Sequence, residues 1–307
     1  MAAVAGLRNV VSCEWLAAAV RAAQPTVQVI DCSWHMPAAA RDARKEFLAQ
    51  RVPGSVFFDL DQCVPPKSET ELPHMMPSAA TLASYLGALG LEPHKPTVVY
   101  DASAFGLFSS PRLWWMLKTA GMPKVAVLDG GLRRWKQLAL PLDSGAPSAA
   151  KPKPFPAPRY SAGFVAAAEV LEGVRRADRA AQLVVDARSQ GRFEGSEPEP
   201  RPGLRRGHIP GSLNVPFTAV LDPAAGTLLP KPAALEVFKK AGLDPARPLP
   251  SKLVFSCGSG VTACVPLLAL VEHWGVPLDR VAVYDGAFAE WGKEADAARF
   301  PIALGPS

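Results

Sequence analysis

Short apolar runs, often rich in β-branched residues, alternate along the chain with longer runs of helical character. Thr97–Tyr100 precedes a helix-like stretch at 112–120, and the apolar run 253–255 precedes another at 263–274. This alternation favours an α/β fold with a largely parallel central sheet flanked by helices. Ligands of such sheets bind beyond the carboxyl ends of the strands. We therefore expect functional residues in the loops that follow these apolar runs.

The chain also matches itself at an offset of about 156 residues. The offset is 155 between Val29-Ile30-Asp31 and Val184-Val185-Asp186, and 156 between the segments 125–130 and 281–286. Trp135 and Trp291 keep the offset of 156. Chance similarity does not hold its register over several segments, so the pattern indicates a tandem duplication.

The duplication predicts two domains of ordinary size, which suits a length of 307 residues. We place the first domain at 7–143 and the second at 161–304. The Pro-rich segment between them, 144–160, is typical of an extended, semi-rigid linker.

The composition narrows the class of protein. The hydrophobic content of 49% with 20% charged residues is that of a globular protein, and the apolar stretches are too short to span a bilayer. The net charge is +5, but the basic pairs are short and lack interleaved aromatic residues. This argues against nucleic-acid binding and favours steering of a small anionic substrate. We expect no metal and no cofactor, and a monomer or weak dimer.

Five scattered cysteines argue against a secreted disulfide scaffold and for a reducing compartment. We expect a cytoplasmic or mitochondrial location. The N-terminus from Met1 lacks a long apolar region, and its basic residues are compatible with a weak amphipathic targeting segment.

The loop Cys257-Gly258-Ser259-Gly260-Val261-Thr262 carries the candidate chemistry. Its cysteine is expected at the end of a strand, in a glycine-rich turn that opens a helix. Glycines let successive N–H groups converge, and these groups with the positive helix end stabilise an anion. A thiolate is favoured in such a setting, which predicts a nucleophilic cysteine rather than a buried structural one.

CGSGVT resembles the active loop of the 3-mercaptopyruvate sulfurtransferases, a family of the rhodanese superfamily. The resemblance extends over nearly the whole chain, through FFDLDQC (57–63), YDAS (100–103), PRLWW (111–115), LDGGL (128–132), GRF (191–193), EPEPR (197–201) and GHIPG (207–211). It implies two tandem rhodanese-like domains. Only the second is expected to be catalytic, because Asp101 stands at the position that corresponds to Cys257.

The resemblance also implies a mechanism and its residues. Cys257 would take sulfur from 3-mercaptopyruvate as a persulfide, release pyruvate, and pass the sulfur to cyanide or to thiol acceptors such as thioredoxin. Arg192 and Arg201 match the substrate-binding arginines, and the backbone of Gly258, Gly260, Val261 and Thr262 would hold the sulfur. Ser259, His74 and Asp61 would form a Ser-His-Asp-like relay for protons. For His74 a merely structural role stays open.

Three alternatives remain. A thiosulfate:cyanide sulfurtransferase would use the same chemistry, but its loop usually carries basic residues where Gly258 and Ser259 stand. A cysteine-dependent phosphatase needs an arginine about six residues after the nucleophile, where this chain has Ala263. A non-catalytic rhodanese-like binding protein is expected to lack the cysteine. We interpret His208, Trp114, Trp115 and the pair Asp186–Arg188 as structural.

Overall fold

The chain forms two compact units in the computed structural model, which describes residues 7–21, 26–148, 150–161 and 163–306. Unit 1 comprises Met1–Pro65, Pro77–Ser161 and Leu221–Leu228. Unit 2 comprises Pro66–Met76, Ala162–Val220 and Leu229–Ser307. Each unit thus contains one short segment from the other half of the sequence. The predicted domain boundaries themselves stay a prediction, and the targeting segment considered at Met1 lies mostly outside the described residues.

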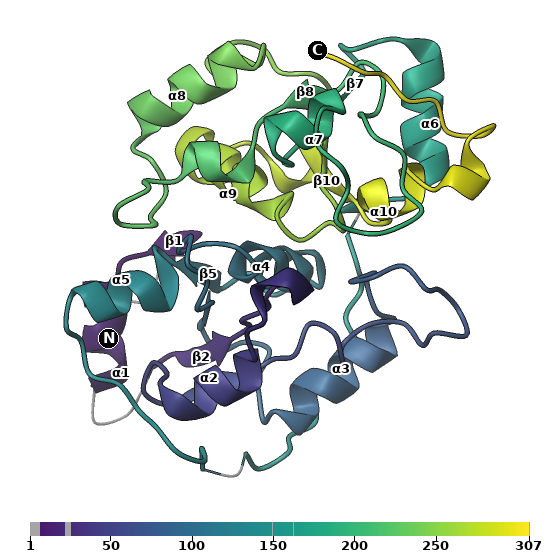
Figure 1. The fold of residues 1–307 in the computed structure, drawn as a ribbon. Coiled ribbons are helices and arrows are strands. Elements are labelled where there is room, and N and C mark those ends of the chain that lie inside the picture. The colour runs from purple at the N-terminus through teal and green to yellow at the C-terminus, as the bar shows by residue number, and fades with distance from the viewer. Residues whose placement is uncertain (1–6, 22–25, 149, 162, 307) are drawn as a thin grey trace. The chain divides into compact units, whose positions relative to one another are not determined.

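Unit 1 is built on a parallel sheet with the strand order β1-β5-β4-β2-β3 (Figure 1). The strands are β1 (Val10–Val11), β2 (Gln28–Asp31), β3 (Ser55–Phe57), β4 (Thr97–Tyr100) and β5 (Val125–Leu128). The helices are α1 (Cys13–Arg21), α2 (Ala43–Ala49), α3 (Ala79–Ala88), α4 (Ser110–Thr119) and α5 (Gly131–Gln137), with a 3-10 turn, η2, at Pro37–Ala39.

Unit 2 repeats this topology with the strand order β6-β10-β9-β7-β8, again all parallel. The strands are β6 (Phe164–Val165), β7 (Gln182–Asp186), β8 (Leu213–Asn214), β9 (Lys252–Ser256) and β10 (Val281–Tyr284). The α-helices are α6 (Ala167–Arg176), α7 (Gln190–Glu194), α8 (Lys231–Lys240), α9 (Cys264–Trp274) and α10 (Ala287–Trp291). The 3-10 turns are η3 (Phe217–Val220), η4 (Leu278–Arg280) and η5 (Glu294–Asp296). The predicted α/β class and the parallel sheets are confirmed.

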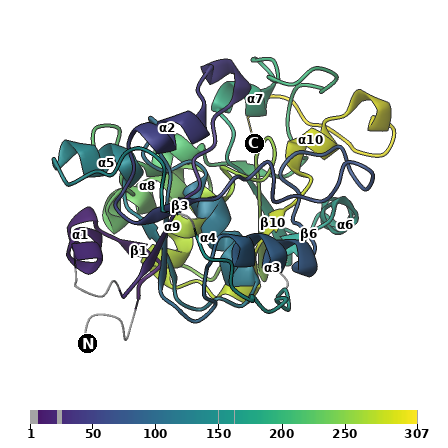
Figure 2. The same ribbon diagram turned by 90° about the horizontal axis from the view of Figure 1, so that it is seen from below.

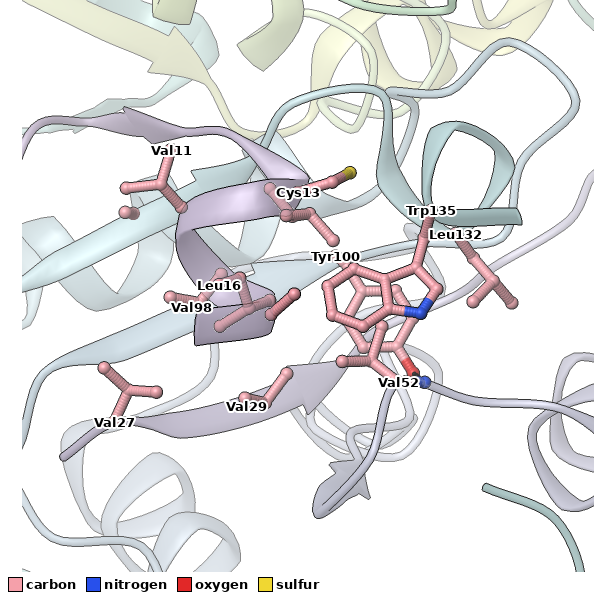
Figure 3. Close-up of a cluster of buried hydrophobic side chains, with 13 residues drawn as sticks. Val11, Cys13, Leu16, Val27, Val29, Val52, Val98, Tyr100, Leu132 and Trp135 are labelled. Carbon is pink, nitrogen blue, oxygen red and sulfur yellow. Dashed lines mark hydrogen bonds between the residues drawn. The ribbon is translucent and has the colours of Figure 1, made fainter. Parts of the chain in front are cut away.

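The sheet of each unit is covered on both faces, as parallel sheets require. Figure 3 shows one covered face in unit 1, where Val29 and Val98 of the strands meet Leu16 of α1 and Trp135 of α5. The corresponding face of unit 2 is covered by α6 and α10, which pack side by side in both views (Figures 1 and 2). All four residues of β4 and of β10 are buried, so the side chains on both faces of these strands lie in the core.

Equivalent tryptophans show how closely the two units repeat each other. Trp135 is fully buried and its indole N–H donates to the carbonyl of Pro141 at 2.8 Å. Trp291 is also fully buried and donates to the carbonyl of Pro301 at 2.7 Å. The same residue thus anchors the chain after the last helix of each sheet, which agrees with the duplication inferred from the sequence.

The Pro-rich segment runs along unit 1 without forming a helix or strand in its described residues, 144–148 and 150–160. The N–H of Lys153 donates to the carbonyl of Gly87 in α3 at 2.9 Å, and its ammonium pairs with Glu92 at 2.7 Å. A Cβ atom at Gly87 would lie 2.6 Å from the Lys153 carbonyl oxygen, so glycine is required for this close approach. The segment is thus held against α3, and its role as a semi-rigid linker stays a prediction.

Candidate functional site

Cys257 directly follows β9 at the carboxyl end of the unit 2 sheet and is 2% exposed. The carbonyls of Cys257 and Gly258 accept hydrogen bonds from the N–H groups of Phe288 and Ala289 in the first turn of α10, at 3.0 and 2.9 Å. In a trans peptide the C=O and the following N–H point in opposite directions. The N–H groups of Gly258 and Ser259 are therefore directed away from α10.

The loop then turns into α9. Gly260 has a φ of +75°, and the carbonyls of Val261 and Thr262 accept from Cys264 and Val265 at 3.2 and 3.1 Å as the helix begins. The N-terminal N–H groups of this 11-residue helix have no intrahelical acceptor and carry its positive partial charge. The loop thus has the form expected of an anion cradle, whereas its function as one stays a prediction.

Gly258 is needed for a reason that the sequence did not reveal. We expected both loop glycines to permit an unusual backbone, but of the two only Gly260 has a positive φ. A Cβ atom at Gly258 would lie 3.2 Å from Nη2 of Arg192 and 3.4 Å from Nη1 of Arg201. Two guanidinium groups therefore converge on the backbone next to Cys257, and the missing side chain makes room for them.

Arg192 is held in place by a buried carboxylate. Its Nε and Nη2 atoms donate to Glu199 at 3.0 and 2.5 Å, which gives a two-pronged ion pair. Glu199 also accepts from Arg188 at 2.8 Å, and Arg188 pairs with Asp186 at 2.6 Å. Burial alone would lower the pKa of Arg188, but Asp186 and Glu199 more than offset this and raise it. The expected structural pairing of Asp186 with Arg188 is confirmed, and Glu199 links it to Arg192.

The helix that carries Arg192 has only five residues and needs further support. The ring of His208 stacks on Phe193 with centroids 3.8 Å apart, and its Nδ1 lies 2.8 Å from the Phe193 carbonyl. Since a carbonyl only accepts, Nδ1 carries the proton. Burial lowers the pKa of His208 below its ordinary value of 6.5, which favours the neutral ring. The structural role predicted for His208 is confirmed.

His74 and Ser259 lie together in unit 2, although 185 residues separate them in the sequence. Nδ1 of His74 is 2.9 Å from the hydroxyl oxygen of Ser259, and the two residues are 4% and 5% exposed. His74 has a φ of +60°, which is uncommon for a residue with a side chain. The pairing predicted from the resemblance is therefore present, and its part in catalysis stays a prediction.

Asp61, the third residue of the predicted relay, belongs to unit 1. There its carboxylate accepts a hydrogen bond from the Trp34 indole N–H at 2.9 Å, and its own N–H donates to Asp59. The indole would orient a carboxylate at this position. Its participation with His74 remains a hypothesis.

Asp285 is a residue of this site that the sequence analysis missed. It follows β10 and is 8% exposed, and its Oδ2 accepts a hydrogen bond from the N–H of Met76 at 2.8 Å. In the sequence this residue stood out only as part of the repeated segment 281–286. The repeat offers a signal, since Asp129 lies at the same offset of 156 and also accepts a backbone N–H, from Leu228, at 2.8 Å.

Comparison with known proteins identifies the family. The model of the rhodanese-like domain matches the chain twice, at residues 12–138 and 167–294. The chain belongs to the rhodanese family. A 3-mercaptopyruvate sulfurtransferase of Rattus norvegicus is 41% identical over 95% of this chain and 94% of that relative. A thiosulfate sulfurtransferase of Bos taurus is 39% identical over 92% of each chain.

Solved structures agree with this rhodanese assignment. The crystal structure of SseA from Escherichia coli, from a study of 3-mercaptopyruvate sulfotransferases, superposes with a TM-score of 0.77 at 36% identity. The match covers 91% of this chain and 98% of SseA. The tandem rhodanese fold predicted from the motifs is thereby confirmed. Among the described helices, none combines the length and hydrophobicity needed to cross a lipid bilayer.

Proposed function

We propose that this rhodanese-family chain is a 3-mercaptopyruvate sulfurtransferase whose nucleophile is Cys257. The observation that carries the proposal is the convergence of Arg192 and Arg201 on Gly258, directly beside the cysteine. The substrate is a small anion with a carboxylate and an adjacent keto oxygen. Planar guanidinium groups suit these two acceptors because they donate paired, parallel hydrogen bonds.

The reaction proceeds in two transfers. The Cys257 thiolate attacks the substrate sulfur, the sulfur–carbon bond breaks, and its electron pair stays on carbon as the enolate of pyruvate. The proton that leaves the substrate thiol is delivered to that carbon, and we assign this proton traffic to Ser259 and His74, with Asp61 orienting the imidazole. The enzyme then holds a persulfide, stabilised by the loop N–H groups from Gly258 to Thr262. Cyanide or a thiolate attacks its outer sulfur and restores the Cys257 thiolate.

The runner-up is a thiosulfate:cyanide sulfurtransferase, favoured by the bovine relative. Thiosulfate is a compact dianion, and cationic side chains within the loop would suit it. Here the loop positions are Gly258 and Ser259, and the cations lie outside the loop. We propose weak use of thiosulfate by this chain.

The test is single-turnover mass spectrometry with 3-mercaptopyruvate and, separately, with thiosulfate. We expect the mass of one sulfur on the Cys257 peptide, with a matching amount of pyruvate from 3-mercaptopyruvate and little adduct from thiosulfate. Cys257→Ser is expected to give no adduct, and Cys264→Ser serves as the matched control on α9. Adduct mainly from thiosulfate would favour the runner-up, and no adduct from either would contradict both.

We further propose that thiols such as thioredoxin accept the sulfur, that the protein works in the cytoplasm or mitochondria, and that it is a monomer or weak dimer. All five cysteines lie in described segments, form no disulfide and are buried, which suits a compartment that keeps thiols reduced. Loss of the Cys257 adduct on addition of reduced thioredoxin would support the first proposal. Sedimentation analysis would decide the oligomeric state.

A further inference from the structure

His74 is fixed at two points within unit 2. Its ring contacts Ser259 on the Cys257 loop at 2.9 Å. Two residues later, the N–H of Met76 donates to Oδ2 of Asp285 at 2.8 Å. Asp285 itself is tied to the sheet, because its N–H donates to the Val165 carbonyl at 3.1 Å at the end of β6. The anchor of the His74 segment is thus a carboxylate at the carboxyl end of β10, next to the strand that precedes Cys257.

The backbone of His74 explains why an anchor is needed. A φ of +60° lies in the left-handed region, where the side chain of a non-glycine residue crowds the backbone. Such a conformation persists only when the surroundings determine it. The bond from Met76 to Asp285 constrains the chain two residues after His74. A segment released there could relax to an ordinary backbone conformation and withdraw the imidazole from Ser259.

The same anchor occurs in unit 1, where it serves no histidine. Oδ1 of Asp129 accepts the N–H of Leu228 at 2.8 Å, and Leu228 ends the segment Leu221–Leu228 that the second half of the sequence contributes to this unit. Asp129 and Asp285 are 156 residues apart, the offset of the repeat. The aspartate anchor therefore belongs to the duplicated fold, and in unit 2 the anchored segment carries His74.

We propose that Asp285 is a positioning residue for sulfur transfer, which acts by holding Met76 so that His74 stays on Ser259. This inference rests on the proposed function, because it assigns Asp285 a part in the same proton transfer. We assign Asp285 no contact with the reacting sulfur and no proton transfer of its own. Its effect on the rate passes entirely through His74.

The test is a double-mutant cycle of Asp285→Ala and His74→Ala, with single-turnover release of pyruvate from 3-mercaptopyruvate as the readout. Loss of a positioned general acid or base slows a reaction by about 100-fold or more, so we expect about that from His74→Ala and about 10- to 100-fold from Asp285→Ala. The double variant is expected to match His74→Ala alone, because coupled residues are not additive. Asp285→Asn keeps an acceptor oxygen for Met76 and is expected to restore the rate to within about threefold.

Asp129→Ala is the matched control, since it removes the equivalent anchor in unit 1. It is expected to destabilise the protein as much as Asp285→Ala does while leaving the rate within about twofold, as surface or remote changes usually do. Multiplying effects in the double variant, or equal rate losses in Asp129→Ala and Asp285→Ala, would overturn the positioning role.

A structural readout separates this inference from the proposed function. In protein labelled with ¹⁵N-histidine, the His74 signal is assigned by its absence from His74→Ala. Asp285→Ala is expected to shift that signal and, in protein labelled uniformly with ¹⁵N, to speed exchange of the Met76 amide, whereas Asp129→Ala is expected to leave both unchanged. An unchanged His74 signal in Asp285→Ala refutes the inference. Absence of any Cys257 adduct in the wild type refutes the proposed function, and the His74 signal then still decides whether Asp285 positions the ring.

Discussion

Replacing Glu199 by glutamine tests the ion-pair cluster that holds Arg192. The Glu199 side chain is 1% exposed, and its two oxygens accept from Arg188 at 2.8 Å and from Arg192 at 3.0 and 2.5 Å. Glutamine keeps one acceptor oxygen but presents an NH₂ group where the second was. One donor of Arg192 then faces another donor, and the cluster loses a negative charge.

The cost follows from these contacts. A hydrogen bond to a charged group contributes about 1.5–3 kcal/mol. Breaking a buried ion pair costs about 3–5 kcal/mol, but Arg188 keeps Asp186 and the Arg192 side chain is 21% exposed, so water can solvate it. We therefore expect Glu199→Gln to lower the free energy of unfolding by about 2–3 kcal/mol, which is close to the value of one charged hydrogen bond.

The assay is urea denaturation at neutral pH, with Glu197→Gln as the matched control. Glu197 is two residues away and exposed, and its carboxylate accepts a hydrogen bond from the Ser189 hydroxyl at 3.0 Å. The control is expected to change stability by less than about 0.5 kcal/mol. Equal effects of the two substitutions would refute the reasoning, because they would show that the buried fork contributes nothing beyond an exposed carboxylate.

The same variant has a consequence for catalysis. A guanidinium that Glu199 no longer holds must be ordered by the substrate, at a cost of about 0.5–1.5 kcal/mol for one side chain. This corresponds to a KM for 3-mercaptopyruvate that is about 2- to 12-fold higher, with a smaller change in kcat. Steady-state kinetics of Glu199→Gln and Glu197→Gln measure the difference. An unchanged KM would show that the position of Arg192 does not depend on the fork.

Two further substitutions test other parts of the structure. Gly258→Ala places a methyl group 3.2 Å from Nη2 of Arg192 and is expected to push the guanidinium partly away from the substrate. Partial loss of one charged hydrogen bond should raise the KM for 3-mercaptopyruvate by about 3- to 10-fold in steady-state kinetics. Asp31 is buried, and desolvation raises its pKa from 3.8 to about 6. The protonated form of Asp31 therefore contributes fully to stability below about pH 4, and this contribution is lost as the pH rises through about 6. Asp31→Asn is expected to reduce this loss, which is at most about 3 kcal/mol, in urea titrations at pH 5 and pH 7.5.

The controls for these two tests come from the same chain. For Gly258→Ala, thermal unfolding should stay near the wild-type value, since φ at this position is not in the left-handed region. A large loss of stability would show that the methyl group disturbs the loop rather than the arginines. For Asp31→Asn the control is Asp42→Asn, which alters a carboxylate on an exposed residue. If both variants changed the pH dependence of stability alike, burial of Asp31 would not be its cause.

The sequence predicted the local parts of the site well. The apolar run 253–255 lies in β9 (Lys252–Ser256), and the helix predicted at 263–274 is α9 (Cys264–Trp274). Both follow from patterns within a few residues, as does the placement of Cys257 between them. The motifs likewise pointed to Arg192 and Arg201, which the structure brings to the same glycine.

What the sequence could not supply is contact between distant segments. The bond from Met76 to Asp285 spans 209 residues, and no local pattern distinguishes an aspartate that anchors another loop from one that forms a turn. The role of Gly258 was misjudged for a similar reason. Its backbone is ordinary, and only the position of Arg192, fixed by a buried carboxylate, makes a side chain there unfavourable.

The divergence of the two repeats can be followed at the position of the nucleophile. Asp101 follows β4 in unit 1 as Cys257 follows β9 in unit 2. The carboxylate of Asp101 accepts from the N–H groups of Phe108, Ser109 and Ser110 at 2.8–3.0 Å, where α4 begins. These N–H groups form the same kind of helix N-terminus that would stabilise a thiolate or persulfide. In unit 1 the carboxylate of Asp101 satisfies them, so the repeat that lacks a cysteine at this position also has an occupied anion site. A gain of sulfur transfer in unit 1 would therefore need more than Asp101→Cys, because the loop that holds the carboxylate would have to be rebuilt.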